Sequence, residues 1–397
     1  MNSPATTQTR RPDVVARARS VLQLLKDAAP RIEAARALPH DVIEALHEAR
    51  LFRLLLPRSL GGDELDLRTH AEILELIASA DASTAWVMSQ GAGCAMGASY
   101  LSGEAARRWF APANAVLAWG AGLQGKAVAV DGGYRVTGTW TFASGSRHAT
   151  ILGGHSMIFE ADGTTPRLRP DGRQLDRTLL FPRAKATIDD VWNVVGLKGT
   201  GSDTFTVTDL FVAEADTIDR ENSAELRETG PLYRFSASLV YGVGFAALML
   251  GIARGILDDL TSLAMTKTPR GAPMSLRESP VFQTQLAQLE ARYRSGRAYL
   301  HETATSIYDD VARTGDITLE QRASVKLATT FVINQSFEVV VEAYRAAGQT
   351  AIFPKNPFER RMRDAMTASQ QTQARGTNFV TVGRCLLGLG PESMMFL

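Results

Sequence analysis

The spacing of apolar residues divides the chain into three regions. In residues 12–112 the apolar positions recur every three to four residues, which predicts amphipathic helices. Pro39 followed by Asp41 is typical of a helix start, the pair Gly61-Gly62 interrupts the pattern, and another helix is expected near Asp81. The repeat is clearest at Val14, Ala18, Val21 and Leu25.

Between residues 113 and 225 the period changes to two. Two β-prone runs, 127–130 and 134–137, flank the turn Asp131-Gly132-Gly133, which predicts a hairpin. The runs 204–207 and 210–212 predict two further strands. Together these signals indicate a compact β-barrel or sandwich.

From residue 231 onward the helical period returns. Phe282, Leu286, Leu289 and Tyr293 fall on one helical face, and another long helix is expected around residues 325–340. This pattern predicts a four-helix bundle. The chain is therefore expected to be α+β, with an N-terminal helical domain at 12–112, a central β-barrel at 113–225 and a C-terminal helical bundle at 231–397.

Composition excludes several classes of function. A formal net charge of +1 argues against a nucleic-acid partner. Cys94 and Cys385 have no metal-ligand or redox spacing, and the polar start has no secretory pattern, so we expect a cytoplasmic protein. Residues 235–253 are uncharged and almost long enough to span a bilayer, but their mild hydropathy favours a buried central helix over a membrane span.

Common catalytic motifs are also absent. The six histidines lack the spacing of a zinc site, and no metal is expected. Gly120-Ala121-Gly122 lacks the strand-turn-helix context of a dinucleotide fingerprint. Ser144 and Ser202 lie in glycine-rich turns that do not match a nucleophile elbow, so spacing alone predicts turn serines.

Four segments together resemble acyl-CoA dehydrogenase-like proteins. They are residues 80–86, 132–145, 192–204 and 360–364, and they follow the family's order over nearly the whole chain. The sequence Trp140-Thr141-Phe142-Ala143-Ser144-Gly145 resembles the branch of two-component, group D flavin-dependent monooxygenases. These enzymes share the fold but receive reduced flavin from a separate reductase.

The resemblance implies which residues hold the flavin. Phe142, Ala143 and Ser144 would lie along the isoalloxazine ring, with backbone amides reaching its polar edge, and Trp119 to Ala121 would form the neighbouring strand end. A neighbouring subunit would hold the phosphate end through Arg270 or Arg277, together with Gly348 and Gln349. The alternatives are that Trp140 and Phe142 are plain barrel core and that Arg277 is a surface charge.

Gln371 stands about where phenol-hydroxylating members of the family carry a histidine. Dehydrogenases of this fold need a carboxylate base, which in the common placement lies near Thr372, but no acid occurs from Ala365 to Gly390. The alternative is a base elsewhere in the bundle, which no feature of the sequence marks. Gln371 can donate and accept hydrogen bonds but cannot act as a base. We therefore expect a substrate that needs no ionisation, such as an indole, with a sulfur or amine centre as the alternative. His148, the nearest histidine to Ser144 in sequence, could compensate for Gln371, although a position on the barrel surface is the alternative.

The resemblance thus implies a monooxygenase using FADH2 or FMNH2 and molecular oxygen. One oxygen atom would pass from a flavin C4a-hydroperoxide to a small electron-rich aromatic or heteroaromatic substrate, with Ser144 hydrogen-bonded to the flavin or the substrate. An NAD(P)H:flavin reductase would be the partner, and the chain would form a homotetramer or homodimer. The alternatives are an acyl-CoA dehydrogenase-type flavin dehydrogenase and a non-catalytic scaffold that kept the fold.

Overall fold

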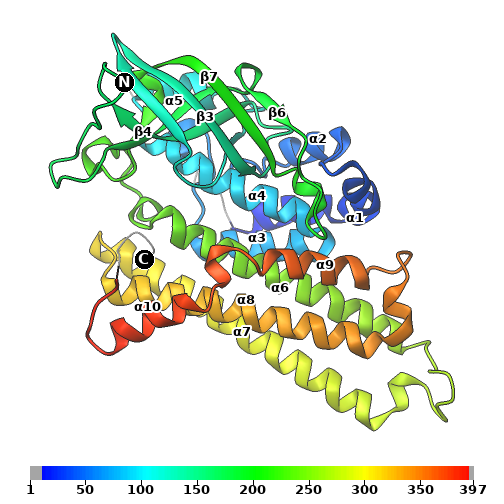
Figure 1. Cartoon of the computed structure of the whole chain (residues 1–397). Helices are drawn as coiled ribbons and strands as arrows, with labels where there is room; N and C mark the ends of the chain where they lie inside the picture. The colour runs from blue at the N-terminus through cyan, green and yellow to red at the C-terminus, as the bar shows by residue number, and fades with distance from the viewer. Residues whose placement is uncertain (1–10, 393–397) are drawn as a thin grey trace.

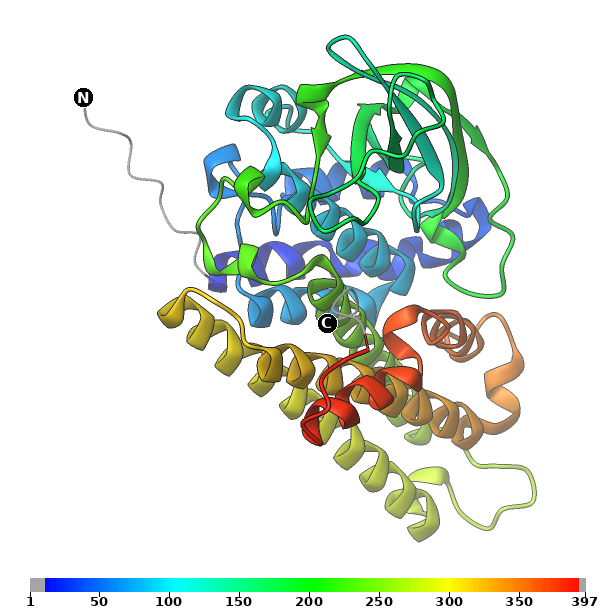
Figure 2. The same cartoon turned by 60° about the vertical axis from the view of Figure 1, so that its left-hand side comes forward.

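The computed structural model describes residues 11–392, which form three stacked units (Figure 1). Helices of the N-terminal unit lie between a curved sheet and a helical bundle, as the turned view also shows (Figure 2). Asp66 caps the N-terminus of α3 and Asp81 caps that of α4, since each carboxylate accepts the backbone N–H three residues further on. The helices of this unit are α1 (Arg11–Ala35), α2 (His40–Glu48), α3 (Leu67–Ala80), α4 (Ala82–Ala95) and α5 (Gly103–Phe110).

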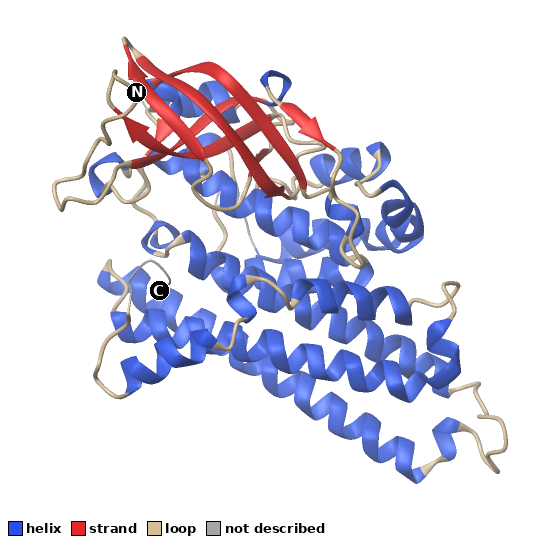
Figure 3. Cartoon of the chain, viewed as in Figure 1, coloured by secondary structure: helices blue, strands red, loops and turns tan. Residues whose placement is uncertain are grey.

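The strands follow in one mixed sheet (Figure 3). Its order is β6-β7-β3-β2-β4-β5-β8, and β1 pairs in parallel with β4. Phe181 of β5 and Phe205 of β7 lie far apart in this order, yet their rings are 6.1 Å apart, so the sheet curls into a barrel around a shared core. The strands are β1 (Leu117–Trp119), β2 (Gly125–Val130), β3 (Gly133–Ala143), β4 (Ile151–Phe159), β5 (Asp176–Pro182), β6 (Thr187–Asp189), β7 (Asp203–Ala213) and β8 (Thr217–Ile218).

Trp140 fills the barrel core. Its side chain is fully buried, its Nε1–H donates to the His155 carbonyl at 2.9 Å, and its ring stacks on Phe205. Glycines surround the indole because a methyl group at any of three positions would come within 2.6 Å of it. These are Gly125, Gly138 and Gly154, one on each of three neighbouring strands. The alternative that Trp140 is barrel core is therefore confirmed.

The hairpin predicted around Asp131 is present, as β2 and β3. The two further strands expected at 204–207 and 210–212 are instead one strand, β7. The register against β3 shifts between Val136 and Gly138, and Asp209 adopts a φ of 50° with its N–H donated to Thr137. A β-bulge therefore keeps the strand continuous at Asp209, where the sequence predicts a break between two strands.

The C-terminal unit is the predicted bundle. Helix α8 packs on α6, α7, α9 and α10, and α6 also packs on α3 of the N-terminal unit. The residues expected on one face, Phe282, Leu289 and Tyr293, are buried, and Leu286 is half-buried. The helices are α6 (Ala237–Ala264), α7 (Pro280–Thr314), α8 (Leu319–Ala347), α9 (Phe358–Ala368) and α10 (Thr377–Leu386).

Helix α6 contains the uncharged stretch. Among the described residues it is the one helix long and apolar enough to cross a membrane, and 89% of its most apolar window is buried inside the protein. It packs between α3 and α8, as a helix that is apolar on all sides does in a large core. The prediction of a central buried helix is confirmed.

Candidate active site

The ends of β1 and β3 lie side by side. A methyl group on Gly120 would come within 2.5 Å of the Trp140 Cβ, so only glycine permits this approach. The Ala121 N–H donates to the Thr141 carbonyl at 2.9 Å. The structure therefore brings together two of the segments expected at the flavin ring. Trp119 is buried, whereas the Ala121 residue is exposed.

Phe142, the second-last residue of β3, has an unusual conformation. Its φ is 57°, which is rare for a bulky residue, and its ring is 62% exposed beside the edge of Trp192. A surrounding structure that holds such a residue on the surface is a frequent mark of a ligand site. The alternative that Phe142 belongs to the barrel core is wrong, because the strained turn directs its ring outward while Ala143 is buried.

Ser144 belongs to a chain of hydrogen bonds. The Trp86 Nε1–H donates to the Ser144 Oγ at 3.0 Å, and that hydroxyl lies 2.7 Å from the Ser202 Oγ. The Ser202 Oγ lies 2.7 Å from the Thr200 hydroxyl, which donates to the Leu197 carbonyl at 2.8 Å. The Ser144 N–H donates to the Phe142 carbonyl. Ser144 therefore joins the N-terminal helices to the loop before β7.

Asp364, in the segment 360–364, fixes the same loop. It is buried, and its Oδ1 accepts the Leu197 N–H at 2.6 Å. Leu197 has a φ of 52°, so this hydrogen bond holds a left-handed residue in place. Burial raises the pKa of Asp364 to about 7, against the effect of the Leu197 N–H. The Asp364 carboxyl group, on α9, is therefore engaged in positioning the loop that contains Leu197.

Gln371 has a buried amide without partners. Both its Oε1 and its Nε2 are shielded from solvent, and neither forms a hydrogen bond within the described part of the chain. An unpartnered buried amide is costly, so it indicates a position that a bound group completes. The turn that follows is well anchored: Thr330 donates to the Gln373 carbonyl, Asn334 to the Ala374 carbonyl, and Asn378 to the Thr372 and Gln373 carbonyls.

His148 is half-buried rather than exposed on the barrel surface. Its ring lies 5.4 Å from that of Phe52, and a methyl group on Gly145 would come within 3.3 Å of its Nε2. The Nε2 is shielded and has no partner among the described residues. Burial lowers the pKa of His148 to about 3, so the ring is neutral at physiological pH.

The residues expected at the flavin phosphate lie at the other end of the bundle. The Lys267 Nζ donates to the Ala347 carbonyl at 2.6 Å and to the Thr350 hydroxyl at 2.9 Å. This lysine ties the loop that carries Arg270 to the turn that contains Gly348 and Gln349. Arg277 follows in the same loop, and all four predicted residues are exposed. In Figure 1 this end of the bundle points away from the sheet.

A cleft of about 790 Å³ opens where the three units meet. It is lined by α4 and the turn after it, by the end of β1 and by the residues that begin α6. Its volume is in the range of small-molecule sites. Its walls include the side chains of Trp119, Tyr100, Tyr233 and Phe235, and the charged residues Arg173, Asp176, Arg220, Glu221 and Arg322.

Comparison with known proteins decides the family. Residues 14–114 match the N-terminal domain of acyl-CoA dehydrogenases, and residues 243–375 match the C-terminal domain. The chain is 30% identical to the indole-3-acetate monooxygenase of Pseudomonas putida over 357 residues, which cover 90% of this chain and 89% of that protein. The chain belongs to the flavin-dependent monooxygenases of the acyl-CoA dehydrogenase fold.

Two further comparisons agree with this family. The FADH(2)-dependent resorcinol hydroxylase, oxygenase component, of Rhizobium sp. (strain MTP-10005) is 27% identical over 98% of each chain. XiaF from Streptomyces sp., solved with FADH2 and glycerol, superposes with a TM-score of 0.87 at 25% identity, over 96% of this chain and 97% of that one. As a monooxygenase of this family, the chain uses reduced flavin and molecular oxygen, and it is an oxygenase component served by a separate reductase.

Sequence reasoning missed the partners of the predicted site residues. Trp86 was part of the resemblance but had no assigned role, and Ser202 was interpreted as a turn serine. Lys267 and Arg220 were not singled out. A Trp or Ser carries no periodic signal for a contact with a residue 58 positions away, such as those Trp86 and Ser202 each make with Ser144.

Proposed function

We propose that this monooxygenase hydroxylates a small electron-rich heteroaromatic substrate such as an indole. The observation that carries the proposal is the neutral, unpartnered amide of Gln371. An amide can hydrogen-bond a bound group but cannot remove a proton from it. A substrate whose ring is already electron-rich needs no such base, and the indole-3-acetate monooxygenase among the relatives is named for an indole.

In this proposal Phe142 and Ala143 would hold the isoalloxazine ring, and Gln371 and Ser144 would offer polar groups to it. A reduced flavin bound there would supply the electrons that activate molecular oxygen. The protein itself would hold the ring, orient the substrate in the cleft beside Trp119 and exclude water. The exposed Phe142 ring, the unpartnered Gln371 amide and the cleft beside Trp119 support this placement.

The flavin phosphate is proposed to rest on the Lys267-linked end of a neighbouring subunit, near Arg270, Gly348 and Gln349. Within one chain this end lies away from the sheet, so one subunit would supply the ring site and another the phosphate site (Figure 1). We accordingly propose a homodimer or homotetramer. FMN and FAD both satisfy this arrangement.

The buried carboxylates disfavour a dehydrogenase. That reaction needs a carboxylate free to take an α-proton from an acyl thioester. Every buried carboxylate among the described residues is already engaged by an arginine, a hydroxyl or a backbone N–H. The pairs are Asp63–Arg17, Glu64–Arg58, Glu75–Arg297, Asp81–Thr84, Asp203–Arg147, Asp219–Arg169 and Asp364–Leu197.

Rapid mixing tests the proposal. The full chain, loaded with reduced FMN or FAD without oxygen, is mixed with oxygenated buffer containing indole. We expect a transient absorbance distinct from that of oxidised flavin, followed by hydroxylated indole. Direct reoxidation without a transient, together with bleaching of the oxidised flavin complex by an acyl-CoA, would instead identify a dehydrogenase.

A further inference from the structure

Arg220 projects its charge into the cleft. Its guanidinium carbon lies 5.1 Å from the centre of the Trp119 ring, although the residue keeps contact with solvent. The charge of Arg220 affects the pKa values of two buried groups, Cys94 and Tyr241. Burial raises the pKa of the Cys94 thiol to about 12 and that of Tyr241 well above its usual range, and the Arg220 charge opposes both shifts. Arg220 is exposed and lines the cleft beside Trp119, where an entering ligand would meet it.

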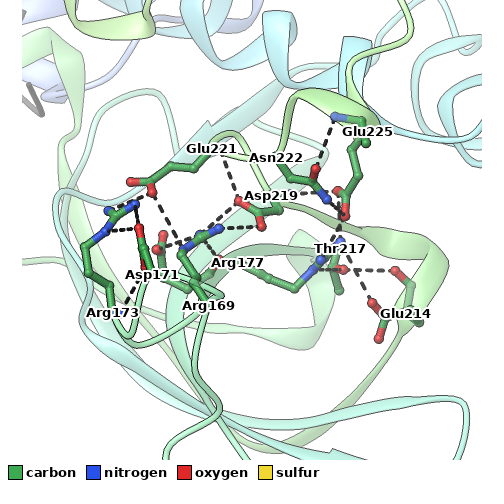
Figure 4. Close-up of polar contacts among 12 residues, drawn as sticks. Arg169, Asp171, Arg173, Arg177, Glu214, Thr217, Asp219, Glu221, Asn222 and Glu225 are labelled. Carbon is green, nitrogen blue, oxygen red and sulfur yellow. Dashed lines mark hydrogen bonds and ion pairs between the residues drawn. The ribbon is translucent and has the colours of Figure 1, made fainter.

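The neighbouring arginines are neutralised, as Figure 4 shows. Arg169 pairs with Asp219 at 2.8 Å, and Arg173 pairs with Glu221 at 2.8 Å. These two carboxylates flank Arg220 in the sequence, so its nearest acidic neighbours in the chain are engaged elsewhere. Farther along the same loop, Glu225 pairs with Arg177 at 3.0 Å, and Asn222 lies beside it.

Arg220 is thus the exception on this wall. Among residues 11–392, no carboxylate lies within ion-pair distance of Arg220, and its guanidinium lies over the face of Trp119. A guanidinium stacked on an indole keeps its N–H groups free around its edge, and their planar arrangement matches a carboxylate. An aromatic ring that enters the cleft beside Trp119 would therefore bring an attached acid group to Arg220.

We propose that Arg220 binds a carboxylate of the substrate, so that the substrate class is a heteroaromatic acid with a short acidic side chain. This inference rests on the proposed function and names the substrate class of the same site. The flavin phosphate is the other oxyanion in the system. The carboxylate is favoured because Arg220 lies over Trp119, whereas the residues proposed for the phosphate lie at the far end of the bundle (Figure 1).

The test compares Arg220→Gln with Arg173→Gln. Both substitutions remove one positive charge from the same wall of the cleft, but Arg173 already has carboxylate partners. Binding of indole-3-acetate and of its neutral isostere, indole-3-acetamide, is measured by calorimetry on the full chain, with and without FMN. We expect Arg220→Gln to weaken the acid about tenfold to a hundredfold and to leave the amide unchanged. Arg173→Gln should change neither.

Other outcomes separate the possibilities. Equal weakening of acid and amide by Arg220→Gln would overturn the inference, because Arg220 would then only shape the cleft. The inference would also be overturned if Arg220→Gln weakened binding of FMN but not of riboflavin and left acid binding unchanged. Arg220 would then bind the flavin phosphate. Partial recovery of acid binding in Arg220→Lys supports the inference and serves if the Gln variant misfolds. Acid binding through Arg220 without an oxygen-dependent product would support the inference while refuting the proposed function.

Discussion

Replacing Asp364 with Asn tests whether the ionised form of this buried carboxyl group destabilises the fold while the group holds the loop at Leu197. Asn keeps an oxygen that can accept the Leu197 N–H, which lies 2.6 Å from the carboxylate oxygen, but it cannot ionise. Burial raises the pKa of Asp364 to about 7 from its ordinary 3.8, so the folded protein retains this proton to higher pH than the unfolded chain does. The stability contributed by the protonated group is complete below about pH 4 and is lost as pH rises through about 7.

The magnitude follows from the shift. A difference of about 3 pKa units, at about 1.36 kcal/mol for each unit, amounts to about 4 kcal/mol at neutral pH. We expect Asp364→Asn and the parent chain to be similarly stable near pH 4. The variant should become progressively more stable than the parent between pH 4 and 7, and the gap should stay constant above pH 8. In thermal unfolding this gap corresponds to several degrees in Tm.

The assay is the free energy of unfolding in denaturant across pH 4 to 8. Asp41→Asn is the control, because Asp41 is exposed and its hydrogen bond from Arg31 lowers its pKa. The interaction of Asp41 with Arg31 stabilises the fold above the unfolded-state pKa of Asp41 and is lost only as pH falls. Asp41→Asn should therefore be less stable than the parent by a constant free energy from pH 5 to 8. Curves for Asp364→Asn and the parent that run parallel over the whole range would refute the reasoning.

Three further predictions concern the site. Gln371→Leu should fold with undiminished stability, because neither amide atom has a partner to lose, but should form less product per oxygen consumed; unchanged coupling would remove Gln371 from the site. Ser144→Ala should lose about 1–3 kcal/mol of stability because the Trp86 N–H is left unpaired. It should also lower product per oxygen more than Ser202→Ala does, and equal effects would make Ser144 purely structural. Lys267→Met should weaken binding of FMN but not of riboflavin, and replacement of the exposed Lys355 by Met is the control. Equal binding of FMN by both variants would contradict the proposed phosphate site.

Local patterns predicted most of the fold. The hairpin around Asp131 was predictable because alternation and a glycine turn are properties of adjacent residues. The long helices were predictable because one apolar stripe persists over many turns. The bulge at Asp209 was not, since an aspartate between two β-prone runs looks the same in the sequence whether the chain turns or continues.

The site was less accessible to sequence reasoning. Resemblance named Phe142 and Ser144, but the outward-facing ring of Phe142 depends on a positive φ that no side-chain pattern encodes. His148 was expected at the barrel surface because sequence distance says nothing about the Phe52 ring that covers it. The role of Arg220 emerges only once the arginines around it are seen to be paired.

The packing around Trp140 has a consequence for how this barrel can evolve. The indole occupies the space that side chains at positions 125, 138 and 154 would otherwise fill, so the four positions share one volume. A smaller residue at 140 opens room at position 154, where the three nearest atoms all belong to the indole. Gly125 is also closed by the Ser156 Oγ, and Gly138 by the Gly125 backbone. Among homologous barrels, positions 140 and 154 should therefore vary together, with a larger residue at 154 only where 140 is smaller than tryptophan.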